Sequence, residues 1–162
     1  MKFRLLPWFI TLLSTVLITA CSKQADHAGH DHGTAHAHAA PHGGVLVEVG
    51  DHQYNLEFVH DAAAGKLTAY VLGGHAEDFV RISQPALELT LTQPGPARTL
   101  TLLGTGNPAT GEKPGDTSQF EASADWLKST APLTGRVTRI DIRGTMFSEI
   151  TFTLSPAHAG AH

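Results

Sequence analysis

The sequence has only one cysteine among its 162 residues, so no disulfide can form within the chain. Methionine is also scarce, with two residues including the initiator. Dedicated Cu(I) sites use such soft sulfur ligands, and their scarcity disfavours Cu(I). Acidic residues outnumber basic ones by 15 to 11. A chain with this charge is not attracted to phosphate backbones, so we expect no nucleic-acid partner.

Several motifs of common enzyme classes are missing as well. The chain has no phosphate-cradling glycine loop of the Walker type, no Gly-x-Ser-x-Gly elbow and no internal repeat of solenoid length. Strand patterns do not alternate with helical ones, which excludes the usual nucleotide-binding folds.

Residues 1–20 have the pattern of a secretory signal peptide. Lys2 and Arg4 precede an apolar run from Leu5 to Ile18, which is shorter than the roughly twenty residues that a membrane-spanning helix needs. Residues 18–21, Ile-Thr-Ala-Cys, resemble the lipobox of bacterial lipoproteins. The resemblance implies cleavage before Cys21, lipidation of its thiol and a location in the cell envelope, facing the periplasm from the outer or inner membrane. Cleavage that leaves a free thiol is the alternative.

The segment from residue 21 to residue 41 consists almost entirely of small and polar residues, with no large apolar side chain to bury. Such a segment cannot offset the entropy of ordering, so we expect a disordered, histidine-rich linker. The short tail at residues 156–162, which holds His158 and His162, is expected to be flexible.

Histidines are concentrated in this linker, with six between residues 27 and 42 and two interleaved aspartates. Neutral imidazole is a good ligand for borderline divalent cations, and a two-residue spacing lets an extended chain turn two rings toward one ion. The sequence therefore predicts an exchangeable site for Zn, Cu(II), Ni or Co. Its candidate ligands are His27, His30, His32, His36, His38, His42, Asp26 and Asp31. A mere solvated spacer is the alternative.

Three histidines in the middle of the chain are weaker candidates. His52 follows Gly50-Asp51, and we interpret it as a turn residue. His60 and His75 join the site only if the ends of their hairpins meet His42. Because the His-x-His pairs lie in a flexible leader and not on rigid strands, we do not expect a metalloenzyme.

Residues 42–155 show short runs of period-two alternation separated by glycine, proline and asparagine turns, which is typical of strands. We expect an antiparallel β-sandwich, immunoglobulin-like, with a partly open barrel as the rival. A helical turn is expected at residues 125–129 and an exposed loop at 104–117. The predicted strands are 44–49, 54–60, 67–72, 79–83, 86–92, 98–103, 118–125, 135–143 and 147–154.

The junction between linker and domain carries a resemblance to a known group of proteins. His42-Gly43-Gly44, an aliphatic run, Gly50-Asp51 and the segment 54–58 look like the HGG-start segment of envelope heavy-metal-binding lipoproteins. The segment is similar to the N-terminal part of cobalt-zinc-cadmium-type efflux adaptor proteins, although this chain lacks the helical hairpin of an adaptor. The resemblance implies metal handling in the envelope, an efflux component as partner, and His42 as a metal ligand.

These observations predict a lipid-anchored protein that binds a divalent transition metal, for sequestration or for delivery to an efflux or resistance system. The alternative is a protein-interaction module of the envelope, in which the histidine tract is a tether or a pH switch.

Overall fold

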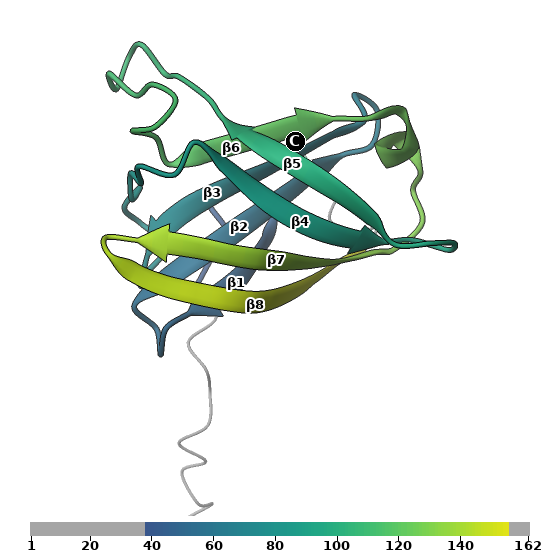
Figure 1. Ribbon diagram of the computed structural model, residues 1–162, viewed down its shortest axis with the longest axis horizontal. Coiled ribbons are helices and arrows are strands. Elements are labelled where there is room, and N and C mark those ends of the chain that lie inside the picture. The colour runs from purple at the N-terminus through teal and green to yellow at the C-terminus, as the bar shows by residue number, and fades with distance from the viewer. Residues whose placement is uncertain (1–37, 156–162) are drawn as a thin grey trace, which may run out of the picture. The chain divides into compact units, whose positions relative to one another are not determined.

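The alternating apolar runs form strands in residues 38–155, the part of the chain that the computed structural model describes (Figure 1). In chain order the elements are β1 (Val45–Val49), β2 (Tyr54–Asp61), β3 (Lys66–Gly73), β4 (Ala86–Thr92), β5 (Arg98–Gly104), β6 (Gln119–Ser123), a 3₁₀ turn (Asp125–Lys128), β7 (Leu133–Ile142) and β8 (Thr145–Leu154). The expected signal peptide with Cys21, most of the linker and the C-terminal tail lie outside the described residues. Within residues 38–155, none of the helical segments has the length and apolarity that a membrane crossing requires.

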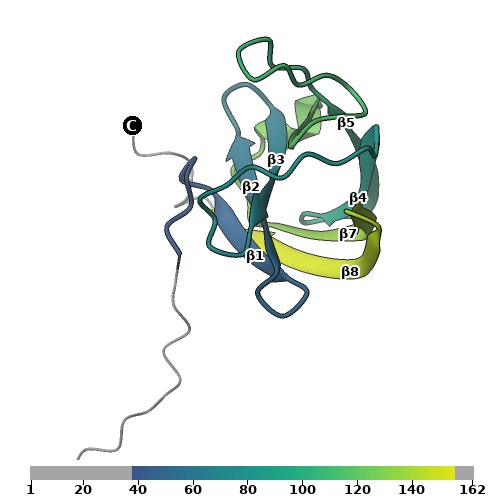
Figure 2. The same ribbon diagram turned by 90° about the vertical axis from the view of Figure 1, so that its left-hand side faces the viewer.

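All eight strands belong to one antiparallel sheet, in the order β1-β2-β3-β6-β5-β4-β7-β8. The sheet curls until its two end strands, β1 and β8, lie side by side, although no ladder of hydrogen bonds joins them (Figure 2). The predicted all-β antiparallel class is confirmed. Of the two arrangements that the sequence allowed, the strands adopt the partly open barrel.

Two of the turns depend on residues with positive φ. Gly65, with φ +65°, closes the hairpin between β2 and β3. Arg143 and Gly144, with φ of +55° and +85°, form the two-residue turn between β7 and β8. Positive φ at both central residues is typical of the type I′ turn, whose twist matches that of the flanking strands.

The core fills the inside of the barrel. The expected alternation of β4 is confirmed, since Leu87, Leu89 and Leu91 are buried while Glu88 and Thr92 are exposed. Phe58 of β2 and Phe152 of β8 stack with ring centroids 3.8 Å apart, which joins strands from opposite ends of the sheet order. The barrel is therefore held together across its seam by side-chain packing.

The predicted strand at residues 79–83 is wrong. The segment makes only two isolated bridges, Leu72 with Phe79 and Ile82 with Thr117. The segment cannot form a ladder because its first residue pairs with β3, whereas Ile82, three residues later, pairs with the chain just before β6. The alternation in its sequence still holds: Val80 and Ile82 are buried, whereas Phe79 and Arg81 face outward.

The other predicted elements form with boundaries shifted by one or two residues. The expected helical turn is the 3₁₀ turn after β6, and the expected long loop joins β5 to β6 without a strand of its own.

We predict that Gly135→Ala lowers the free energy of unfolding by about 1–3 kcal/mol, the usual cost of overpacking a core. Gly135 of β7 lies opposite Phe152, and a Cβ atom there would come within 2.5 Å or less of the Phe152 ring. Urea denaturation measures the change, with exposed Thr134→Ala as the neighbouring control. Equal stability of the two variants would contradict the packing described.

Candidate functional site

The structure describes four of the candidate ligands. His27, His30, His32 and His36, together with Asp26 and Asp31, lie outside the described residues. His38 and His42 belong to the short segment that precedes β1, whereas His60 lies on β2 and His75 follows β3.

His42 is bound to a carboxylate from the middle of β2. Its Nδ1 atom lies 2.8 Å from Oε2 of Glu57. The other carboxylate oxygen, Oε1, accepts the backbone N–H groups of His42 at 2.8 Å and of Gly44 at 2.9 Å. The Glu57 side chain is 0 % exposed, while that of His42 is 31 % exposed. Nothing in the sequence pattern singles out Glu57, and its role as an anchor is visible only in the fold.

The anchor explains why the junction contains two glycines. Gly43 has a φ of +70°, a conformation that side-chain-bearing residues seldom adopt. At Gly44 the chain passes so close to β2 that an added Cβ would lie 2.4 Å from the Phe58 carbonyl oxygen. These two positions bring both backbone N–H groups onto Glu57. The His-Gly-Gly sequence thus supplies hydrogen-bond donors to a buried carboxylate.

The hydrogen bond to Glu57 also sets the chemistry of the His42 ring. A carboxylate accepts hydrogen bonds and does not donate them, so Nδ1 carries a proton; in the neutral form of the ring, Nε2 then has the lone pair. Metal-binding histidines almost always make such a contact, because it orients the ring and raises the basicity of the coordinating nitrogen. His42 therefore has the partner that a metal ligand requires.

The face of the His42 ring packs against Tyr70 of β3, with ring centroids 3.7 Å apart and planes only 7° from parallel. Tyr70 lies directly opposite Glu57 in the ladder between β2 and β3. Burial raises the pKa of the Tyr70 hydroxyl, and the charges of Glu57 and Glu121 raise it further. The phenol stays neutral at physiological pH, in a region of negative potential.

A second pair of histidines lies close by in the fold. The rings of His38 and His75 meet edge to face, with centroids 5.5 Å apart. His75 thus reaches the linker histidine His38, a contact that the sequence did not anticipate.

His60 and His52 make their contacts outside these two pairs. His60 Nε2 lies 2.6 Å from the Leu127 carbonyl oxygen in the 3₁₀ turn, where the ring N–H fixes that turn against β2. His52 is exposed and pairs with Glu48 at 2.9 Å. Within residues 38–155, no group of three or more His, Cys, Asp or Glu side chains is arranged to hold a metal ion.

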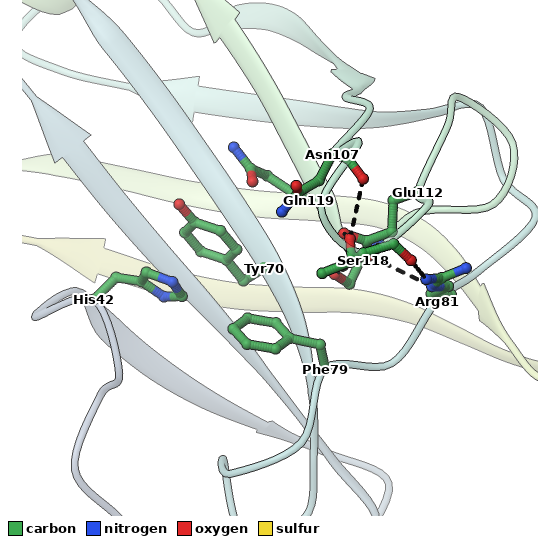
Figure 3. A pocket seen from close by; sticks show the side chains of 9 residues that line it. His42, Tyr70, Phe79, Arg81, Asn107, Glu112, Ser118 and Gln119 are labelled. Carbon is green, nitrogen blue, oxygen red and sulfur yellow. Dashed lines mark hydrogen bonds and ion pairs between the residues drawn. The ribbon is translucent and has the colours of Figure 1, made fainter.

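Beyond Tyr70 the surface is hollowed into a pocket of about 340 Å³ (Figure 3). His42, Tyr70 and Phe79 form its aromatic side, and Phe79 is 51 % exposed. The polar side consists of Arg81, Asn107, Thr110, Glu112, Ser118 and Gln119. The pocket therefore combines ring faces with hydrogen-bonding groups.

A network around Glu112 makes the polar side rigid. Its Oε1 atom accepts the Ser118 backbone N–H at 2.9 Å and the Ser118 hydroxyl at 2.6 Å. Its Oε2 atom accepts the Thr110 hydroxyl at 2.8 Å. Burial raises the pKa of the carboxyl group, but these hydrogen bonds and the charge of Arg81 outweigh that effect, so the pKa is lowered. Glu112 is therefore a carboxylate at neutral pH.

Comparison of the chain with protein-family models, with curated proteins and with solved structures returned no match.

We predict that Glu57→Gln loosens the segment before β1 without unfolding the barrel. The amide oxygen at the Oε1 position is uncharged, and hydrogen bonds to a neutral acceptor contribute about 1 kcal/mol less than those to a charged one. The amide nitrogen at the Oε2 position must donate to Nδ1, which moves the ring proton to Nε2. Amide hydrogen exchange should become faster by about fivefold or more at His42 and Gly44, and stay unchanged at core residue Phe58.

Glu48→Gln is the matched control, because Glu48 also pairs with a histidine Nδ1 but is exposed. Unchanged exchange at Gly44 in Glu57→Gln would show that Glu57 does not anchor this segment.

Proposed function

We propose that the protein is an envelope lipoprotein that captures a divalent transition metal, Zn(II), Cu(II), Ni(II) or Co(II), and holds it for sequestration or for delivery to an efflux or resistance system. The observation that carries this proposal is the pairing of His42 Nδ1 with the buried carboxylate of Glu57. That pairing leaves Nε2 available in a fixed orientation.

The number of ligands supports an exchangeable site. The described residues offer His42, which Glu57 orients, and the pair of His38 and His75, but no group of three ligands. A structural zinc site needs four ligands. The others must come from the histidines that precede residue 38 in the sequence. Closing a chain segment around an ion costs entropy, and this cost weakens binding and favours capture and release over permanent retention.

The donor set narrows the class of metal. Imidazole nitrogen suits Zn, Cu(II), Ni and Co, whereas Mg and Ca prefer oxygen ligands. The sequence pattern of residues 1–21 supports the envelope location, and we propose Cys21 as the lipid-bearing residue. The resemblance of the His42-Gly43-Gly44 segment to efflux adaptors supports an efflux or resistance system as the partner.

We predict that His42→Ala and Glu57→Gln both weaken metal binding by the purified full-length chain, by about tenfold or more. Loss of His42 removes a ligand, and loss of the carboxylate removes the partner that orients it, which typically costs 10–100-fold in affinity. Competition titrations with a chromophoric chelator measure the affinity for Zn(II), Cu(II), Ni(II) and Co(II).

His60→Ala is the control for the first variant, because His60 is bonded to the Leu127 carbonyl oxygen in the 3₁₀ turn and belongs to neither the His42–Glu57 pair nor the His38–His75 pair. Glu48→Gln is the control for the second. If His42→Ala binds all four metals as tightly as the unmodified chain, His42 is not a ligand and the proposal fails at its central residue.

We also predict that deleting residues 27–38 lowers the metal stoichiometry, and that bound metal is lost between pH 7.5 and pH 5.5. Protonated imidazole has no lone pair to donate, so occupancy must fall as pH falls. Equilibrium dialysis with elemental analysis at several pH values measures both effects. Unchanged uptake by the deletion variant would instead favour an envelope interaction module in which the tract is a tether.

A further inference from the structure

We propose that the pocket beside Tyr70 binds a primary ammonium group carried on an alkyl stem, with Tyr70 and Phe79 as its aromatic walls. This ligand differs in chemistry from the metal ion of the proposed function. The pocket is also largely separate in its residues, since only His42 belongs to both sites.

The two aromatic residues form one continuous wall of the pocket. The Tyr70 and Phe79 rings contact each other edge to face, with centroids 6.3 Å apart and planes inclined at 62°. They come from β3 and from the outward positions of the segment 79–83, and Figure 3 shows both rings on the same side of the pocket. His42 packs against Tyr70 and so holds that ring in place. Ring faces attract cations through their quadrupole, and they also bury an alkyl stem.

The charges around the pocket favour a cation over an anion. Arg81 is the only basic residue in the lining, and it is already neutralised. Its guanidinium donates to the Thr110 carbonyl, pairs with Asp116 at 3.4 Å and lies 3.9 Å from Glu112. With two carboxylates facing one guanidinium, this corner carries a net negative charge.

The aromatic side has the same sign of charge. Glu57 lies beneath His42, and Glu121 follows two residues after Gln119 on β6. Lys66 offsets Glu121 at 3.6 Å. Lys113, next to Glu112 in the chain, is a third basic group, so four carboxylates stand against three basic groups, Arg81, Lys66 and Lys113, when His42 is left out of the count.

Hydrogen-bond acceptors select the kind of cation. Asn107 and Gln119 add side-chain amides to the lining. The Asn107 amide oxygen already accepts the Ala109 N–H at 3.0 Å and has one further lone pair, and the Gln119 amide oxygen can also accept. A primary ammonium has three N–H donors to satisfy, whereas a quaternary ammonium has none. The combination of two ring faces, amide oxygens and excess carboxylate therefore fits a lysine-like end group. The volume of about 340 Å³ holds such a group together with its alkyl stem.

The experiment tests the binding of four small probes to the isotopically labelled full-length chain. A chelator is present so that a bound metal ion does not change the charge around the pocket. The probes are butylammonium, butanol, butyrate and tetramethylammonium, and nitrogen–proton NMR spectra report binding at each residue. Butylammonium should give saturable shifts at Tyr70, Phe79 and Gln119. Its affinity should exceed those of butanol and tetramethylammonium by about tenfold, and butyrate should not bind.

Two variants test the walls and the charge separately. Phe79→Ala should weaken butylammonium roughly two- to thirtyfold, the range of a cation–π contact. Glu121→Gln should weaken it about twofold or more without changing the response to butanol. Met146→Ala is the control, because Met146 is also an exposed large apolar residue, 55 % exposed, but does not line the pocket.

A lysine blocked at its α-amino and carboxyl groups distinguishes the two sources of the ligand. Tighter binding than butylammonium assigns the pocket to a lysine side chain of a protein, and equal or weaker binding assigns it to a free amine. Butanol or butyrate binding as tightly as butylammonium would overturn the proposal. So would tighter binding of the neutral sugar N-acetylglucosamine, or no saturable shift with any probe. Failure here leaves the metal affinity of the chain unaffected, so the two proposals fail separately.

Discussion

The burial of the Glu57 carboxylate on the outer face of the barrel is the constraint on which the site depends. A carboxylate removed from water must be matched by donors, and the available donors are two backbone N–H groups and the ring N–H of His42. Meeting that need fixes the path of the chain from His42 to Gly44. The orientation of His42, its stacking on Tyr70 and one side of the pocket follow from it.

The barrel was largely predictable because alternation reports directly on which face of a strand is buried. It predicted the core positions of β4, and the buried and exposed residues of the segment 79–83 follow the same alternation. It could not predict that this segment lacks a ladder. Whether an extended segment pairs along its length depends on which strands flank it in space, and Phe79 and Ile82 bridge to partners from different parts of the chain.

The site was less predictable for a related reason. Histidine spacing is local, so the candidate ligands could be named from the sequence. Glu57, however, occupies an outward position of β2, where a charged residue would be expected to face solvent. Its burial comes from a segment thirteen to fifteen residues earlier that folds back over it. The one available signal was the pair of glycines after His42, which indicates a close approach of two backbone segments. The sequence does not show which segment they approach.

The two proposed sites would use different parts of the His42 ring. A metal would use the lone pair at the edge of the ring, on Nε2, whereas the pocket uses the ring as support for Tyr70. Because Nδ1 is held by Glu57 and the ring face by Tyr70, coordination at Nε2 need not rotate the ring. Rotation of the ring would remove the His42 N–H from the buried Glu57 carboxylate. The free-energy cost of that loss exceeds the gain from one new exposed contact. The geometry therefore permits both ligands at once, and any coupling between them acts through charge: a dication at Nε2 lowers the negative potential that attracts an ammonium group.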